Sequence, residues 1–176
     1  MTTEKIVVDL TQHYKAQPQQ LKFHNTTARR VLLGGAAGGG KSAALRNDAY
    51  YLAIHCPGLQ VYIFRRTLTE LEANHIRFIR KELPEILGSW NENRKAFEFT
   101  NGSRITCGYA ESDIDVDRYQ GAEIHYLCID EAGQFSPYQI GFLCSRNRLG
   151  GWSAPEKHAA QLPRIALTAN PGGRSH

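Results

Sequence analysis

The sequence lacks any long apolar run. No stretch of about eighteen apolar residues, the length that a membrane-spanning helix needs, occurs among its 176 residues. The polar N-terminus, from Met1 to Lys5, is also unlike a secretory signal. We therefore expect a soluble, intracellular protein.

Cysteine is scarce, and its copies form no CxxC pair, so the usual spacing of a zinc site is absent. Cys128 lies inside an apolar, strand-like run, and the other three (Cys56, Cys107 and Cys144) are scattered. This pattern favours buried thiols in a reducing compartment over disulfides or a zinc site.

Basic runs with interleaved aromatic residues, which are typical of many nucleic-acid-binding surfaces, are missing as well. The net charge of +4 is compatible with a polyanionic partner, but its magnitude carries little weight alone. Hydrophobic residues make up 41% of the chain. This length and composition predict one domain with a sizeable core and exclude a second full domain.

A glycine-rich segment is the most informative feature that is present. It follows the apolar run Val31–Leu33 and places a glycine, four further residues and then Gly-Lys-Ser at the start of a helical pattern. A simple Gly/Ala-rich turn does not require Lys-Ser there. Backbone amides of such a loop point at phosphates, Lys41 adds positive charge, and the Ser42 hydroxyl suits Mg²⁺. The residues expected to bind a nucleoside triphosphate are Gly35, Ala36, Ala37, Gly38, Gly39, Gly40, Lys41, Ser42 and Ala43.

Strand and helix patterns alternate around this loop. A strand over residues 31–35, a helix over 41–55 and a strand over 60–65 predict a βαβ unit. The next helix, capped by Thr67 or Thr69, is expected to run to about Leu83 with an apolar stripe on one face. Residues 96–100 and 103–109 flank Asn-Gly, which predicts an antiparallel hairpin. We expect an α/β protein with a three-layer α/β/α arrangement, a mainly parallel sheet and an appended hairpin.

Two adjacent acids, Asp130 and Glu131, follow the apolar run 125–129 directly. At the C-terminal end of a parallel strand they can face the phosphate loop, where Asp130 supports Mg²⁺ and Glu131 polarises an attacking water. A surface Asp-Glu that caps the helix near Ser136 is the alternative. The upstream loop favours the catalytic interpretation, and the second acid favours hydrolysis over phosphoryl transfer to a substrate.

A short apolar strand over residues 164–170 ends in Thr168, Ala169 and Asn170 and is followed by Pro-Gly-Gly. Small polar side chains at such a strand end can bond the γ-phosphate or its water and report hydrolysis. An ordinary turn is the alternative. The position after the acid-bearing strand favours a coupling role.

The ordered set of motifs resembles the N-terminal ATPase domain of a tailed-bacteriophage terminase large subunit, a DNA-packaging motor. The resemblance covers nearly the whole chain and rests on QLKF from Gln20, GGAAGGGKS from Gly34, FRRT from Phe64, YQGAE from Tyr119, IDEA from Ile129 and TANPGG from Thr168. It implies a P-loop NTPase fold of the additional-strand (ASCE) type, with residues 1–30 as a leader and residues 31–176 as the core. It also implies Mg²⁺-dependent hydrolysis of ATP in the host cytoplasm at the prohead portal.

The partners that the resemblance implies are double-stranded DNA, the portal protein, a small terminase subunit and further copies in a homo-oligomeric ring. Family members continue into a lid and a nuclease domain, so we expect this chain to be a fragment. A helicase-like or remodelling ATPase and a non-catalytic, nucleotide-gated interaction module remain alternatives. The first should carry a second motor lobe, and the second should carry a compromised Lys41 or Glu131.

Two further assignments come from the same resemblance. Gln20 corresponds to the glutamine that reads the adenine edge, with neighbouring Gln19 as a competitor and a solvent-exposed glutamine in a polar leader as the alternative. No arginine occurs inside the loop, so a trans-acting arginine is required, and Arg118 is the first candidate. Arg118 could instead be a solvated side chain among Asp113, Asp115 and Asp117, with Arg146 or Arg148 in the catalytic role.

Arg65 and Arg66 end the second strand near the expected ATP-binding edge. They could contact phosphate, the DNA backbone, or Glu70 and Glu72. A structural ion pair with these glutamates is the first expectation, and a DNA contact is the second.

Overall fold

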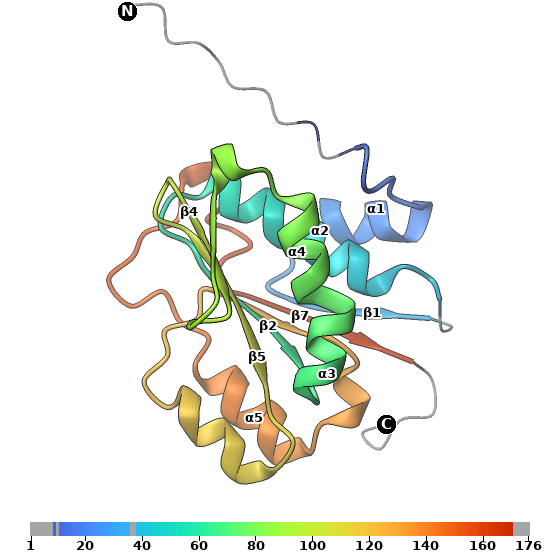
Figure 1. Ribbon diagram of the computed structural model, residues 1–176, viewed down its shortest axis with the longest axis vertical. Helices are drawn as coiled ribbons and strands as arrows, with labels where there is room; N and C mark the ends of the chain where they lie inside the picture. Colours follow the sequence, from blue (N-terminus) through green and yellow to red (C-terminus); the bar gives the residue numbers. More distant parts are fainter. Residues whose placement is uncertain (1–8, 10, 36–37, 171–176) are drawn as a thin grey trace, which may run out of the picture.

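The computed structural model describes residue 9, residues 11–35 and residues 38–170, and these form one seven-stranded sheet with helices on both faces (Figure 1). The strand order is β1-β7-β6-β2-β5-β4-β3. The strands are β1 (Arg30–Gly34), β2 (Gln60–Arg65), β3 (Gly88–Asn91), β4 (Ala96–Phe99), β5 (Arg104–Tyr109), β6 (Tyr126–Ile129) and β7 (Arg164–Ala169).

The first five strands in this spatial order, β1, β7, β6, β2 and β5, pair in parallel. Strands β4 and β3 then extend the sheet with antiparallel pairing. Strand β7 lies between β1, which leads into the glycine-rich loop, and β6, which leads into Asp130. This insertion is the additional strand expected from the sequence. Strand β5 pairs with both β2 and β4, so the predicted hairpin is confirmed and extends the main sheet.

The helices divide into two layers. In Figure 1, α1, α2 and the α3–α4 segment lie on one side of the sheet, and α5 lies on the other beside the helical segment 113–119. The α-helices are α1 (Pro18–Asn25), α2 (Lys41–His55), α3 (Leu68–Leu71), α4 (Arg77–Glu82) and α5 (Pro137–Ser145). The other helical segments are the π-helical turn η1 (Glu72–Ile76) and the 3₁₀ segments η2 (Glu85–Leu87), η3 (Asp113–Tyr119), η4 (Ala132–Gln134) and η5 (Glu156–His158). The three-layer prediction is confirmed.

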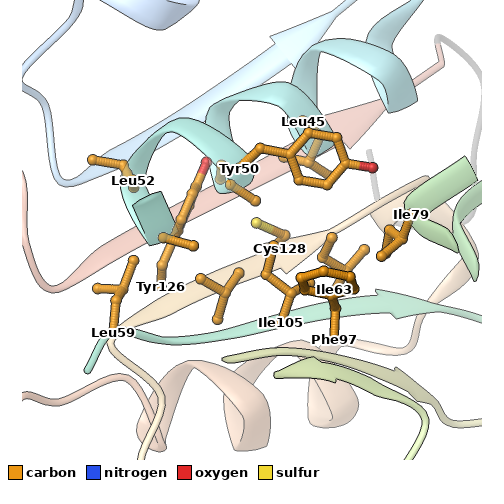
Figure 2. Packing of buried hydrophobic residues seen from close by; sticks show 14 of the residues in the cluster. Leu45, Tyr50, Leu52, Leu59, Ile63, Ile79, Phe97, Ile105, Tyr126 and Cys128 are labelled. Atoms are coloured by element: carbon orange, nitrogen blue, oxygen red, sulfur yellow. The ribbon is translucent and has the colours of Figure 1, made fainter. Parts of the chain in front are cut away.

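Helix α2 anchors the larger of two hydrophobic clusters, one on each face of the sheet. Figure 2 shows Leu45 and Tyr50 of α2 above Ile63 and Cys128 of the sheet, with Ile79 of α4 at the side. All five side chains are fully buried. Each large apolar side chain buried in this way contributes about 1.5–3 kcal/mol. The cluster therefore fixes the helix that begins at Lys41 against the strands that carry the acids.

Three local features differ from the sequence analysis: one predicted helix is divided, and two elements were not predicted. The helix expected from Thr67 to Leu83 begins as predicted, with Thr67 Oγ1 accepting from the amide of Glu70, but a π-helical turn divides it. Strand β3 and helix α1 were not predicted, because Gly88–Asn91 has no clear alternation and α1 has little apolar character. Both are stabilised by tertiary neighbours, β4 and α2 respectively.

No helix in residues 9, 11–35 and 38–170 is long and apolar enough to cross a membrane. All four cysteines are free; three are buried, and Cys144 is partly buried. The expectation of mostly buried thiols agrees with this arrangement.

Candidate functional site

A cavity of about 320 Å³ lies at the edge of the sheet where the parallel strands end. The phosphate-loop segment after β1, the acids after β6, and Asn170 after β7 all reach it, because carboxyl ends of parallel strands share one edge. Its lining residues are Gly38, Gly39, Gly40, Lys41, Ser42, Arg65, Asn74, Asp130, Glu131 and Asn170. The structure thus brings three separate sequence motifs to one place.

The glycine-rich loop has the backbone conformation that its composition allows. Gly38 and Gly40 have φ of +80° and +68°, in the left-handed region that favours glycine, and α2 starts directly after Gly40. Lys41 Nζ donates to the carbonyl oxygen of Gly35 over 2.9 Å. Ala36 and Ala37, also expected to bind nucleotide, lie outside the described residues. Ala43 is part of α2.

Gln20 is held against this loop. Its side-chain amide donates to the Gly39 carbonyl over 3.0 Å, while its Oε1 accepts from the Gln17 amide and the Tyr14 hydroxyl. Only 4% of Gln20 is exposed. The alternative of a solvent-exposed glutamine is therefore wrong for Gln20, whereas Gln19 is exposed.

Asp130 is 1% exposed and is surrounded by hydrogen-bond donors. Its Oδ2 lies 2.8 Å from Ser42 Oγ and 2.9 Å from His75 Nε2, and Thr168 Oγ1 donates to its Oδ1. Burial alone would raise the pKa of Asp130, but the hydrogen bond from His75, the charge of Arg65 and the hydrogen bond from Thr168 outweigh it. The pKa is therefore well below its usual range, and the carboxylate is ionised.

Glu131 combines an unusual backbone with an ion pair. Its φ of +54° and ψ of +53° place a non-glycine residue in the left-handed region, which costs about 1–2 kcal/mol. Its amide donates to Thr168 Oγ1 over 2.9 Å, and its carboxylate lies 2.7 Å from Arg65 and accepts from Gln134. The surrounding contacts hold this strained residue at the mouth of the site, with 28% of its side chain exposed.

Arg65 lines the cavity, although the sequence analysis did not count it among the site residues. Its guanidinium, 6% exposed, lies 3.3 Å from Asp130 and 2.7 Å from Glu131. An ion pair was expected, but with Glu70 and Glu72, and that choice of partners is wrong. Glu70 instead contacts Thr67, and Arg66 donates to Gln139 over 2.9 Å. Proximity in sequence favoured the wrong glutamates, whereas the end of β2 lies beside β6.

At the end of β7, Thr168 contacts both acids and is fully buried, Ala169 pairs in register with Gly34 of β1, and Asn170 lines the cavity. The Asn170 Oδ1 atom is buried and has no hydrogen-bond partner in the described residues. A buried acceptor of this kind is suited to a donor that a ligand or its water brings.

Arg118 lies outside the cavity lining. It belongs to η3, pairs with Asp115 over 2.9 Å and covers the ring of Tyr109 at 4.7 Å. Its side chain is 45% exposed. These contacts match the alternative expectation, a solvated arginine among acidic residues. A catalytic role of Arg118 in a neighbouring subunit stays a prediction.

The donors at the site fit Mg²⁺. Ser42 and Asp130 offer hard oxygen atoms beside the phosphate loop, which suits a cation that keeps several waters and substrate phosphates as ligands. Within the described residues, no group of three or more His, Cys, Asp and Glu could hold a metal by itself.

Comparisons with known proteins bear on the family and the fold. A family profile described as the N-terminal part of the terminase large subunit, T4-like-virus type, matches residues 32–161. No curated protein sequence matches. The large terminase of a thermophilic bacteriophage has a TM-score of 0.68 at 14% identity, over 88% of this chain and 39% of that one.

The ATPase domain of the Thermus phage P74-26 large terminase has a TM-score of 0.62 at 20% identity, over 91% of this chain and 66% of that one. A point variant of that domain gives 0.63 at 21% identity, with 91% and 67% covered. At these identities the structural likeness shows the shared fold. The chain spans about two-fifths of the length of the thermophilic phage terminase.

Proposed function

The chain belongs to the family of terminase large subunit N-terminal domains, and on this premise we propose that it hydrolyses ATP to drive packaging of double-stranded DNA into a viral prohead. The observation that carries the proposal is the meeting of the phosphate loop, the Asp130-Glu131 pair and Asn170 around one cavity. A nucleoside triphosphate needs these three parts together: a phosphate cradle, a metal ligand with a base, and a group that responds to hydrolysis.

Binding is assigned to the loop. The amides of Gly38 to Ser42 surround the phosphates at the N-terminus of α2, where the helix dipole favours negative charge. Lys41 exchanges its contact with Gly35 for the β- and γ-phosphates. Gln20 is assigned to the adenine edge, for which its side chain would exchange its present contacts with Gly39 and Gln17.

Mg²⁺, when bound, neutralises part of the charge that develops on the phosphates. Ser42 and Asp130 would hold it: the hydroxyl hydrogen of Ser42 goes to Asp130, which leaves the oxygen lone pairs of Ser42 available to a cation. Asp130 is ionised throughout the physiological pH range, so it remains an acceptor.

Glu131 orients the attacking water and accepts its proton. In the described state its carboxylate is paired with Arg65 over 2.7 Å. We therefore assign Arg65 the role of holding Glu131 until the γ-phosphate and its water compete for these groups. Thr168 links Asp130 to the backbone of Glu131. Asn170 responds to the loss of the γ-phosphate on hydrolysis.

Mechanical work requires partners. The portal protein, a small terminase subunit, DNA and a ring of further copies are proposed on family membership. In that ring Arg118, half-exposed and outside the lining of the cavity, is a trans-acting arginine. If Arg118→Ala leaves ATP turnover of the assembled ring unchanged while Arg146→Ala or Arg148→Ala abolishes it, this assignment is wrong.

The test is phosphate release by Glu131→Gln, with and without double-stranded DNA. Glutamine keeps the size and polarity of Glu131 but accepts no proton, so turnover should fall by about 10²–10⁴-fold while ATP still binds. Lys41→Ala should weaken both binding and turnover. Arg94→Ala, on an exposed side chain of the β3–β4 turn, is the matched control.

Retained hydrolysis by Glu131→Gln would show that another group is the base. DNA-independent nucleotide binding without turnover by the unaltered chain would favour a nucleotide-gated interaction module. Unwinding of a DNA duplex would favour the helicase-like alternative.

A further inference from the structure

A histidine that belongs to none of the nucleotide motifs contacts the proposed metal ligand. His75 is fully buried, and its Nε2 lies 2.9 Å from Asp130 Oδ2. It comes from η1, between α3 and α4, whereas Ser42 comes from the first turn of α2 and Thr168 from β7. His75 therefore links the α3–α4 segment to the carboxylate.

The π-helical turn sets the direction of His75. A π-turn inserts one residue into a helix and rotates the residues that follow, and such turns concentrate at functional sites. Here the Asn74 carbonyl accepts from Arg46 of α2 over 2.6 Å. Arg46 is itself buried and lies 3.5 Å from Glu82. The nucleotide-binding helix α2 thus holds the turn that presents His75.

The chemistry fixes which nitrogen carries the hydrogen. An ionised carboxylate only accepts, so Nε2 of His75 is the donor toward Asp130. The other nitrogen, Nδ1, is buried and has no hydrogen-bond partner in the described residues. A fully buried imidazole with one unpartnered nitrogen lowers the stability of the fold. Its contact with Asp130, the proposed metal ligand, is a functional explanation for a histidine at this position.

We propose that His75 is a positioning residue that fixes the carboxylate of Asp130 in the orientation required for Mg²⁺. Together with Thr168 on Oδ1 and Ser42 on Oδ2, it leaves Asp130 little rotational freedom. This inference rests on the proposed nucleotide site. Removing a hydrogen-bond partner of a metal ligand generally costs about 10–100-fold in metal affinity.

The test measures how strongly Mg²⁺ tightens binding of a fluorescent, non-hydrolysable ATP analogue to the whole chain. His75→Leu removes the donor and should reduce the Mg²⁺-dependent gain in affinity by about 10-fold or more, with metal-free binding of the analogue unchanged. His75→Gln carries an amide nitrogen near the position of Nε2 and should restore most of the gain. His158→Leu, on another buried histidine outside the site, is the control.

Thermal melting shows whether each variant folds. If His75→Leu does not melt cooperatively, His75→Asn takes its place, because its shorter amide does not reach Asp130. A leucine or asparagine variant that keeps the full effect of Mg²⁺, or that loses metal-free binding equally, overturns the inference. If the unaltered chain shows no binding of the analogue at all, the proposed nucleotide site fails instead.

Discussion

Two buried aspartates have nearly the same set of partners and different places in the fold. Asp130 contacts an imidazole, a guanidinium and two hydroxyls. Asp48 of α2, 5% exposed, contacts His24 at 3.0 Å, Arg164 at 3.5 Å and the Tyr126 hydroxyl at 2.6 Å. The partners of a buried carboxylate therefore do not reveal what it does.

Cavity size does not separate the two regions either. The cavity beside Asp48, about 480 Å³, is larger than the one beside Asp130. What distinguishes Asp130 is its place at the carboxyl edge of the sheet, next to a loop of phosphate-binding type. Asp48 joins α1 and α2 to β6 and β7, and Arg164 also donates to the carbonyl oxygens of Phe23 and Ala28. We interpret one region as chemical and the other as structural.

Asp130→Asn gives the largest expected effect that tests this contrast. The amide retains one acceptor but removes the charge next to Ser42, so ATP turnover should fall by about 10²–10³-fold. Phosphate release per folded molecule measures it. If Asp48→Asn lowers turnover of folded molecules to the same degree, the two regions are not functionally distinct.

Asp48→Asn should act on stability instead. Arg164 is fully buried, and breaking a buried charge pair costs about 3–5 kcal/mol. Urea unfolding gives the change in the free energy of unfolding. Asp117→Asn, on an exposed aspartate, is the matched control and should change it by less than about 0.5 kcal/mol. A similarly small change in the free energy of unfolding for Asp48→Asn would contradict a structural role for Asp48.

The smallest effect is a pH dependence. An aspartate in the unfolded chain has a pKa of about 4, and the pKa of folded Asp130 lies below this value. Between these two pKa values the unfolded state therefore binds more protons than the folded state. The stabilisation from its charge is complete above about pH 5 and is lost as the pH falls through the folded pKa. The difference in unfolding free energy between the unaltered chain and Asp130→Asn should shrink from about pH 6 to about pH 3. A constant difference would contradict an ionised, stabilising Asp130.

The same contrast explains what the sequence could predict. Asp130 and Glu131 were found because a strand pattern and two adjacent acids are local features, and the parallel topology then requires the strand ends to meet. Asp48 was not singled out, because an aspartate in a helix has no local signature of burial; its partners lie 24, 78 and 116 residues away in sequence.

His75 and Arg65 show the other limit. A lone histidine within an amphipathic helix predicts only a core or surface position, and its direction here depends on a π-turn that no local pattern indicates. Arg65 was placed at the correct edge of the sheet, but its partners depend on β2 lying next to β6. Strand pairing determines the contacts of Arg65, and the π-turn determines the direction of His75.

The position of β7 also has a consequence for the order in which the molecule can assemble. Strand β1 is at one end of the sheet order, and β7 is its neighbour, with Arg30 opposite Ile165 and Gly34 opposite Ala169. These partners are separated by 135 residues. During synthesis, β1 emerges early and has no strand to pair with until β7 leaves the ribosome. Such long-range parallel pairing is slow to form, so the nucleotide site is among the last parts of the domain to be completed.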